Sequence, residues 1–167
     1  LNGRFLDETP GALWSVAEID ASRVLRPPEE LVRIVVGVDP AVSCNSGSDS
    51  TGIVAAGIDG KGEYYVLRDA SGRFSPLEWG HRVIDLYHEL GADRIVGEVN
   101  NGGDLIEAML RQIDPDLSFR AVCASRGKIV RAEPVAALYE KKKVHHVGVF
   151  PDLEDQMTGF SPATTAY

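Results

Sequence analysis

Short apolar runs alternate with amphipathic segments along most of this chain. Residues 33–39, RIVVGVD, are apolar at almost every position, which is typical of a central strand covered on both faces. Residues 51–58 and 63–69 form two more apolar runs around Asp59 and Gly60, and this spacing predicts an antiparallel β-hairpin. The sheet is therefore expected to begin with three consecutive strands.

Helical periodicity begins near residue 75 and then alternates with further strands. Residues 75–90 carry apolar side chains at helical spacing behind Ser75, a predicted N-cap. The other predicted elements are strands at 93–99, 118–124 and 144–150, and helices at 103–113 and 127–143, with Pro134 blurring the start of the last helix. The order β-β-β-α-β-α-β-α-β predicts an α/β fold, a mixed central sheet with helices on both faces.

The first thirty residues differ from the rest of the chain. Residues 11–24 form one predicted helix, and the RPPEE segment that follows breaks it. Because this stretch is too short to bury a core and the chain starts at Leu1, we interpret residues 1–30 as a linker or the tail of an upstream part. Residues 31–167 are expected to form one globular domain, since 44% of the 167 residues are hydrophobic.

Composition excludes several classes of protein. No run approaches 18 consecutive apolar residues, so we expect no membrane span. The start of the chain lacks the basic and apolar regions of a signal peptide. Two cysteines are too few for a disulfide framework or a zinc site, which fits a reducing cytosol.

Two predicted strands end on a carboxylate. Asp39 ends the run 33–39, and Glu98 ends the run 94–98. If these strands are parallel neighbours, both side chains lie at the carboxyl edge of the sheet, where open α/β folds bind ligands. Adjacent carboxylates repel each other, and Mg²⁺ or Mn²⁺ would relieve that repulsion with the oxygen ligands these ions prefer. We therefore predict a metal site at Asp39 and Glu98; the alternative is two solvated strand ends.

Positive charge is concentrated in one segment of an acidic chain. The formal net charge is −8, but residues 126–146 hold six Lys or Arg side chains against two Glu, a local charge of +4. Lys128 and Arg131 are three positions apart and share a helix face. We predict that they bind phosphate groups and that Arg126 is a further candidate; a solvated helix face is the alternative.

Four motifs together resemble the C-terminal nuclease domain of phage terminase large subunits. They are VVGVDPAVS with SDSTGIVAAGID, RIVGEVNNGGDLI, GKIVRAEPVAALYEKKKVHHVG and PDLEDQMTGFSP, in the family's order over residues 31–162. The resemblance implies the RNase H-like fold for residues 31–167 and a connection from a missing ATPase domain for residues 1–30. It also implies an enzyme, a divalent-metal-dependent endonuclease that cuts concatemeric viral double-stranded DNA during packaging.

The resemblance further implies a two-metal site, in which Asp39 bridges two Mg²⁺ or Mn²⁺ ions and Glu98 holds one of them. The family's third acidic residue follows a serine- and proline-rich stretch, and no residue of this chain matches it. We therefore expect the third ligand beyond Tyr167 and a domain truncated before its last helix. With one ligand short, this chain alone is expected to cut poorly or not at all.

Loop residues are additional candidates. Asp49 lies where the family often has an acid, so the resemblance makes it a candidate metal ligand; a loop-capping aspartate is the alternative. Asn100 and Asn101 precede a predicted helix whose N-terminus can accept a phosphate. Asp104 as a plain N-cap would explain the same residues without DNA.

The resemblance also implies partners and a location. Double-stranded DNA, the portal protein and the small terminase subunit would be the partners, within an oligomeric motor that contains no membrane part. ATP would act only through the missing N-terminal domain. The expected location is the cytoplasm of the infected bacterial host.

Three other functions remain open from the sequence alone. A Holliday-junction resolvase or another RNase H-like nuclease would keep the fold and change the substrate. An actin-like ATPase also opens with a strand, an aspartate and a hairpin, but Pro40 follows Asp39 here and no second Asp-x-Gly turn is found. A non-catalytic DNA-binding module would explain the lack of a third ligand.

Overall fold

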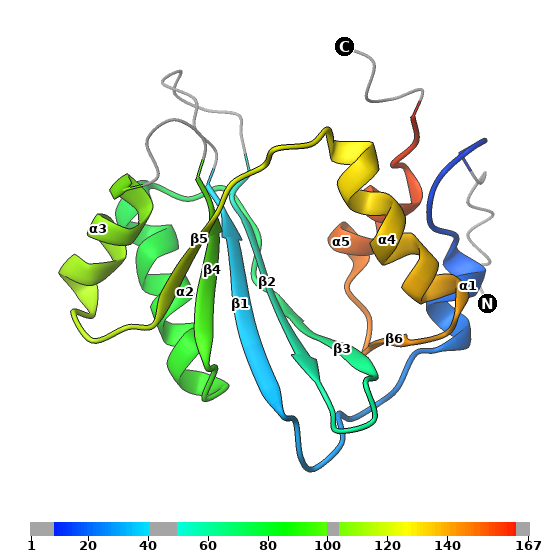
Figure 1. Cartoon of the computed structure of the whole chain (residues 1–167), viewed down its shortest axis with the longest axis horizontal. Helices are drawn as coiled ribbons and strands as arrows, with labels where there is room; N and C mark the ends of the chain where they lie inside the picture. Colours follow the sequence, from blue (N-terminus) through cyan, green and yellow to red (C-terminus); the bar gives the residue numbers. More distant parts are fainter. Residues whose placement is uncertain (1–8, 41–49, 100–103, 163–167) are drawn as a thin grey trace.

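A six-stranded mixed sheet forms the centre of the computed structural model, which describes residues 9–40, 50–99 and 104–162. The strands are β1 Arg33–Asp39, β2 Gly52–Ile58, β3 Tyr64–Asp69, β4 Arg94–Glu98, β5 Phe119–Val122 and β6 Val144–His146. The helices are α1 Val16–Ala21, α2 Pro76–Glu89, α3 Asp104–Ile113, α4 Lys128–Glu140 and α5 Pro151–Thr158. Helices α2 and α3 lie on one side of the sheet, and α1, α4 and α5 lie on the other (Figure 1).

The sheet has the strand order β5-β4-β1-β2-β3-β6. Strands β1, β2 and β3 are consecutive and antiparallel, as the hairpin pattern predicted. Strands β4 and β5 run parallel to β1 on one side, and β6 runs parallel to β3 at the other edge. The predicted α/β class with a mixed sheet and helices on both faces is therefore confirmed.

The first helical layer, α2 and α3, covers the larger core. Val36 of β1 is fully buried there, together with Val83 of α2 and Leu110 of α3. The predicted N-cap Ser75 is confirmed, since it forms a capping box at the start of α2. Leu105 is 76% exposed, because it lies at the start of α3, beyond the packed part of the layer.

The second helical layer packs over β2, β3 and β6. Trp14 and Ile19 from the N-terminal segment meet Val66 of β3, Tyr139 of α4 and Val144 of β6 in a second buried cluster. Backbone hydrogen bonds also tie this segment to the end of the chain, as between the N–H of residue 13 and the carbonyl of residue 160 at 3.1 Å. Residues 9–24 thus pack as part of this layer; the domain boundary at residue 30 stays a prediction.

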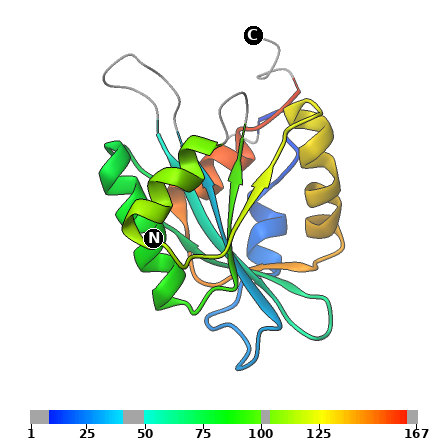
Figure 2. The same ribbon diagram turned by 60° about the vertical axis from the view of Figure 1, so that its left-hand side comes forward.

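Among the residues that the structure describes, no helix covers one face of β1, β4 and β5. On β1 the side chains of Val36 and Val38 are buried by the first layer, whereas Val35, which points the other way, is only half-buried. The prediction that this strand is covered on both faces is wrong, because the second layer packs on β2, β3 and β6 instead. We call this surface of β1, β4 and β5 the open face; Figure 2 shows the three strands from a second direction.

Two helices depart from the sequence pattern. Helix α4 runs without interruption through Pro134, which is exposed. It ends at Glu140, and the backbone of Lys142 just after it is left-handed (φ 56°). Helix α5 was not predicted; it begins at Pro151, a residue whose fixed φ suits the first turn of a helix. In the described part of the chain, no helix is long and apolar enough to cross a bilayer.

Candidate active site

Asp39 and Glu98 lie side by side at the carboxyl ends of two parallel strands. Val38 of β1 pairs with Gly97 of β4, so Asp39 and Glu98 occupy the next step of the ladder. Adjacent strands are about 5 Å apart. Both side chains lie on the open-face side, because they continue the alternation that starts at Val35 and its partner across the ladder. The structure therefore brings the two predicted carboxylates together, and we call Asp39 and Glu98 the acidic pair.

The electrostatics of Asp39 reflect this neighbourhood. Its pKa is raised, first by partial burial at the strand end and then by the like charge of Glu98. Lys128 and Arg131 act in the opposite direction and lower the same pKa. Four charged groups, two acidic and two basic, thus act on one another at this edge of the sheet.

Helix α4 brings the two cations to the carboxylates from its first turn. Arg131 donates a hydrogen bond from Nη1 to Oε2 of Glu98 at 2.7 Å. Lys128, one turn earlier, is exposed and lines the same cleft. The predicted shared helix face of Lys128 and Arg131 is therefore present, and it faces Asp39 and Glu98. The cleft that all four residues line has a volume of about 450 Å³.

The opposite wall of the cleft is largely apolar and comes from segments far apart in the chain. It is lined by Trp14 from the N-terminal segment, Leu153 and Met157 from α5, and Phe160 after α5. The Trp14 ring lies 5.8 Å from the ring of Phe160, centroid to centroid. Trp14 is buried, and its place in one cleft with Asp39 and Glu98 was not predicted. No local pattern marks it, because its neighbours come from helices more than 100 positions away.

A buried polar network holds this wall in place, and we call it the polar clasp: Arg23, Tyr139, His146 and Glu154. Glu154 accepts hydrogen bonds from Arg23 at 2.6 and 3.1 Å and contacts Nδ1 of His146 at 2.8 Å. Nε2 of the fully buried His146 lies 2.7 Å from the hydroxyl of Tyr139. His145, the neighbour of His146 on β6, has separate partners, the carbonyl of Ser22 and the carboxylate of Glu63, both at 2.8 Å.

The pKa values within the polar clasp show which charges it stabilises. Burial lowers the pKa of His146, which favours the neutral imidazole. Burial works to raise the pKa of Glu154, but hydrogen bonds from Arg23 and His146 outweigh it and hold that pKa below its usual range. Burial also raises the pKa of the Tyr139 hydroxyl, which therefore stays protonated. The ionised Glu154 accordingly contacts both the charged Arg23 and the neutral His146.

One predicted site residue does not line this cleft, and three others lie outside the residues that the structure describes. Asp49, Asn100 and Asn101 lie outside the described residues. Arg126 is exposed just before α4 and does not line the cleft. Among the residues that the structure describes, no group of three or more His, Cys, Asp or Glu side chains is arranged to hold a metal ion. The described part of the site thus offers two carboxylates.

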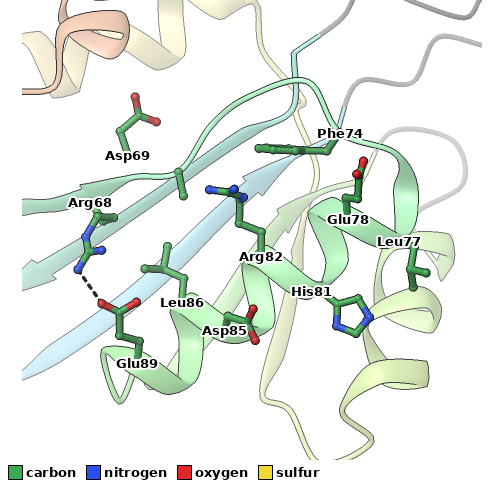
Figure 3. Close-up of a pocket in the computed structure, with 11 residues that line it drawn as sticks. Arg68, Asp69, Phe74, Leu77, Glu78, His81, Arg82, Asp85, Leu86 and Glu89 are labelled. Atoms are coloured by element: carbon green, nitrogen blue, oxygen red, sulfur yellow. Dashed lines mark hydrogen bonds and ion pairs between the residues drawn. The ribbon is translucent and has the colours of Figure 1, made fainter.

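A larger pocket, of about 680 Å³, lies on the other side of the sheet between β3 and α2 (Figure 3). Its two arginines are already engaged: Arg68 pairs with Glu89 at 2.8 Å, and Arg82 lies 4.7 Å from the ring centroid of Phe74. Four carboxylates line the same pocket. This balance of charge makes it a poorer phosphate site than the cleft beside α4, despite its greater volume.

Most of the chain matches one known protein family. A family model described as a terminase RNaseH-like domain matches residues 36–165. Curated proteins give no match by sequence. Among solved structures, the human cytomegalovirus terminase nuclease domain is 15% identical, with 90% of this chain and 86% of that chain covered and a TM-score of 0.63.

Two phage structures are similar to a comparable extent. The large terminase of a thermophilic bacteriophage, in complex with ATP-gamma-S, is 11% identical with a TM-score of 0.66; 89% of this chain matches 36% of that one. The large terminase nuclease of the thermophilic phage G20c, with bound zinc, is 16% identical, covers 88% of each chain and has a TM-score of 0.60. At these identities the structures establish the RNase H-like fold.

Proposed function

Because the chain belongs to the family of terminase RNase H-like domains, we propose that it is a divalent-metal-dependent endonuclease that cuts double-stranded DNA during viral genome packaging. The observation that carries the proposal is the cleft beside α4. Asp39 and Glu98 stand there in one ladder step, and Lys128 and Arg131 face them. Acidic ligands for metal ions next to cations for phosphate oxygens are what phosphodiester hydrolysis requires.

The carboxylates fit a divalent cation chemically. Oxygen ligands suit Mg²⁺ and Mn²⁺, and the raised pKa of Asp39 means that the two negative charges are incompletely balanced without one. Arg131 donates to a single oxygen of Glu98, Oε2. The G20c nuclease was solved with bound zinc, which supports a divalent ion in this family. We propose Mg²⁺ or Mn²⁺, which Asp39 and Glu98 would hold.

Each group of the cleft has a role in the proposed reaction. Divalent ions, when bound, supply Lewis acidity and an activated water. Asp39 and Glu98 are held rigidly for them because each ends a strand of the sheet. Lys128 and Arg131 bind oxygens of the phosphate through charge-assisted hydrogen bonds.

Partners of the protein follow from the family. We infer double-stranded DNA as substrate, an oligomeric packaging motor with portal protein and small subunit, and the cytoplasm of an infected bacterium as the location. ATP would act through a domain outside these residues. Asp49 is a candidate for a further metal ligand, and the third family acid would lie after Tyr167. Asn100, Asn101 and Arg126 are proposed DNA contacts.

Nicking of supercoiled plasmid in the presence of Mn²⁺ tests the proposal. The wild-type chain is compared with Asp39→Asn and with Asp85→Asn, which changes an exposed carboxylate on α2 outside the cleft. If the gene encodes residues after Tyr167, a chain that includes them is assayed in parallel. We expect the longest chain to nick in a way that requires the metal, survives Asp85→Asn and disappears with Asp39→Asn, and residues 1–167 alone to cut poorly or not at all.

Other outcomes would contradict the proposal in distinct ways. Nicking that persists without Asp39, or no nicking by the longest chain, would refute the metal-dependent nuclease. Cutting of four-way junctions in strong preference to linear duplex would favour a junction resolvase. A strong preference for one sequence would also count against the proposal, since the contacts proposed for Lys128 and Arg131 are to phosphate oxygens.

A further inference from the structure

Three arginines form a diagonal row on the open face, outside the cleft. They are Arg33 on β1, Arg94 on β4 and Arg120 on β5, and we call them the arginine stripe. Arg94 pairs with Val35, two residues after Arg33, and Arg120 pairs with Val96, two residues after Arg94. From one arginine to the next, the row crosses to the neighbouring strand and advances by two residues, which places their Cα atoms about 8 Å apart. The whole stripe is therefore about 16 Å long.

The arginine stripe carries positive charge that the described residues do not neutralise. Within the described ranges, none of its three arginines forms an ion pair, whereas Arg68, Arg111 and Arg131 all do. The stripe lines a pocket of about 350 Å³ together with Val35, Asp93 and Val96. Asp93 is the one carboxylate in that lining, and its Oδ2 accepts a hydrogen bond from the N–H of Ile34 at 2.8 Å. This pocket of an acidic protein is thus suited to an anionic ligand.

The stripe leads to the acidic pair along the same face of the sheet. Arg120 lies one strand across and two residues before Glu98, about 8 Å away between Cα atoms. Arg94 precedes Glu98 by four residues on one strand, about 13 Å, and Arg33 precedes Asp39 by six residues, about 20 Å. At about 3.4 Å of rise per nucleotide along a strand, the two longer distances correspond to roughly four to six base pairs.

We propose that the arginine stripe binds the phosphate backbone of the DNA duplex, roughly two to six base pairs from the bond that is cut. The inference rests on the proposed nuclease function and adds a second contact surface to it. Cations spaced along a flat sheet face match the regular phosphates of a duplex backbone, so we expect the stripe to bind without regard to sequence. Its continuity with the acidic pair and its row of spaced cations favour a nucleic-acid backbone over an acidic protein segment.

Salt-dependent DNA binding tests the arginine stripe apart from cleavage. In the Asp39→Asn background, the double variant Arg94→Gln/Arg120→Gln is compared with Arg68→Gln/Arg82→Gln, which removes the same charge from exposed arginines between β3 and α2. Affinity for a short labelled duplex is measured by fluorescence anisotropy over a series of KCl concentrations. Each single variant is measured too, so that a folding defect in a double variant leaves the comparison standing.

We expect the stripe double variant to bind the duplex at least about tenfold more weakly than its parent, with a salt slope shallower by roughly two. The control double variant should keep most of the affinity and the slope. Equal DNA binding by the stripe variant and its parent would refute the proposed role of the stripe and leave the nuclease proposal standing. No DNA binding by the parent would overturn both. If the stripe double variant lost binding to a polyglutamate peptide but kept binding to DNA, the stripe would be assigned to an acidic protein segment and the proposal would be refuted.

Discussion

Replacing Glu154 by alanine tests how the cleft wall is held. Glu154 accepts two hydrogen bonds from Arg23, contacts Nδ1 of His146 and accepts one from the N–H of Phe150 at 3.2 Å. Alanine removes all four contacts at once. The guanidinium of Arg23 and the fully buried ring of His146 would then lose their shared partner inside the second layer.

The expected loss follows from burial. The side chains of Glu154 and Arg23 are 14% and 18% exposed. Breaking a buried ion pair by removing one partner costs about 3–5 kcal/mol, and the residual exposure places this pair near the lower end, about 3 kcal/mol. For a domain of this size each kcal/mol corresponds to roughly 2–4 °C in Tm, so we expect Tm to fall by roughly 6–12 °C.

Thermal and urea unfolding at neutral pH provide the measurement, with Glu89→Ala as the matched control. Glu89 also pairs with an arginine, Arg68, at 2.8 Å, but the two side chains are 56% and 45% exposed. An exposed pair contributes about 0–1 kcal/mol, so the control should change Tm little. If Glu154→Ala and Glu89→Ala lost the same stability, burial would not be what makes the polar clasp matter, and the reasoning would fail.

Three further predictions concern packing, pH and the acidic pair. Gly97→Ala places a Cβ 2.8 Å from Cζ of Phe119, so urea unfolding should show a loss of about 1–2 kcal/mol; unchanged stability would mean that the ring moves freely. Burial lowers the pKa of His146 below its ordinary 6.5. As the pH falls through 6.5, the unfolded chain therefore binds a proton at His146 that the native state does not bind. Tm should therefore fall as the pH drops below 6.5, and the fall should be smaller in His146→Gln; equal falls would place the titrating group elsewhere. Because the like charge of Glu98 helps to raise the pKa of Asp39, Asp39→Asn should unfold at the same or a higher temperature than wild type without metal and lose stabilisation by Mn²⁺; a lower metal-free Tm would show that the carboxylate stabilises the fold.

The acidic pair was predictable because it depends on local signals and one rule of topology. Asp39 and Glu98 each end an apolar run, and parallel neighbours bring such ends to one edge of a sheet. The three-residue spacing of Lys128 and Arg131 likewise fixed their common helix face. The ion pair between Arg131 and Glu98 was not predictable, since it depends on where α4 docks after crossing from β5.

Two other features could not be derived from pattern. A valine-rich strand has the same sequence whether one face or both are covered, so the open face of β1 was missed. The place of Trp14 in the cleft wall and the helix α5 both depend on packing between the two ends of the described chain. Such long-range contacts leave no periodicity in either segment.

Separation along the chain has a consequence for how the domain is made. Arg23 and Glu154, which pair in the polar clasp, are 131 positions apart, and Val24 forms its bridge with Val147. At translation rates of roughly 5–20 residues per second, the N-terminal segment waits on the order of ten seconds for its partners to leave the ribosome. The sheet and first helical layer can assemble during that delay, whereas the wall beside Asp39 cannot. The cleft is therefore completed last, and a nascent domain is expected to stay inactive until nearly all of it has been synthesised.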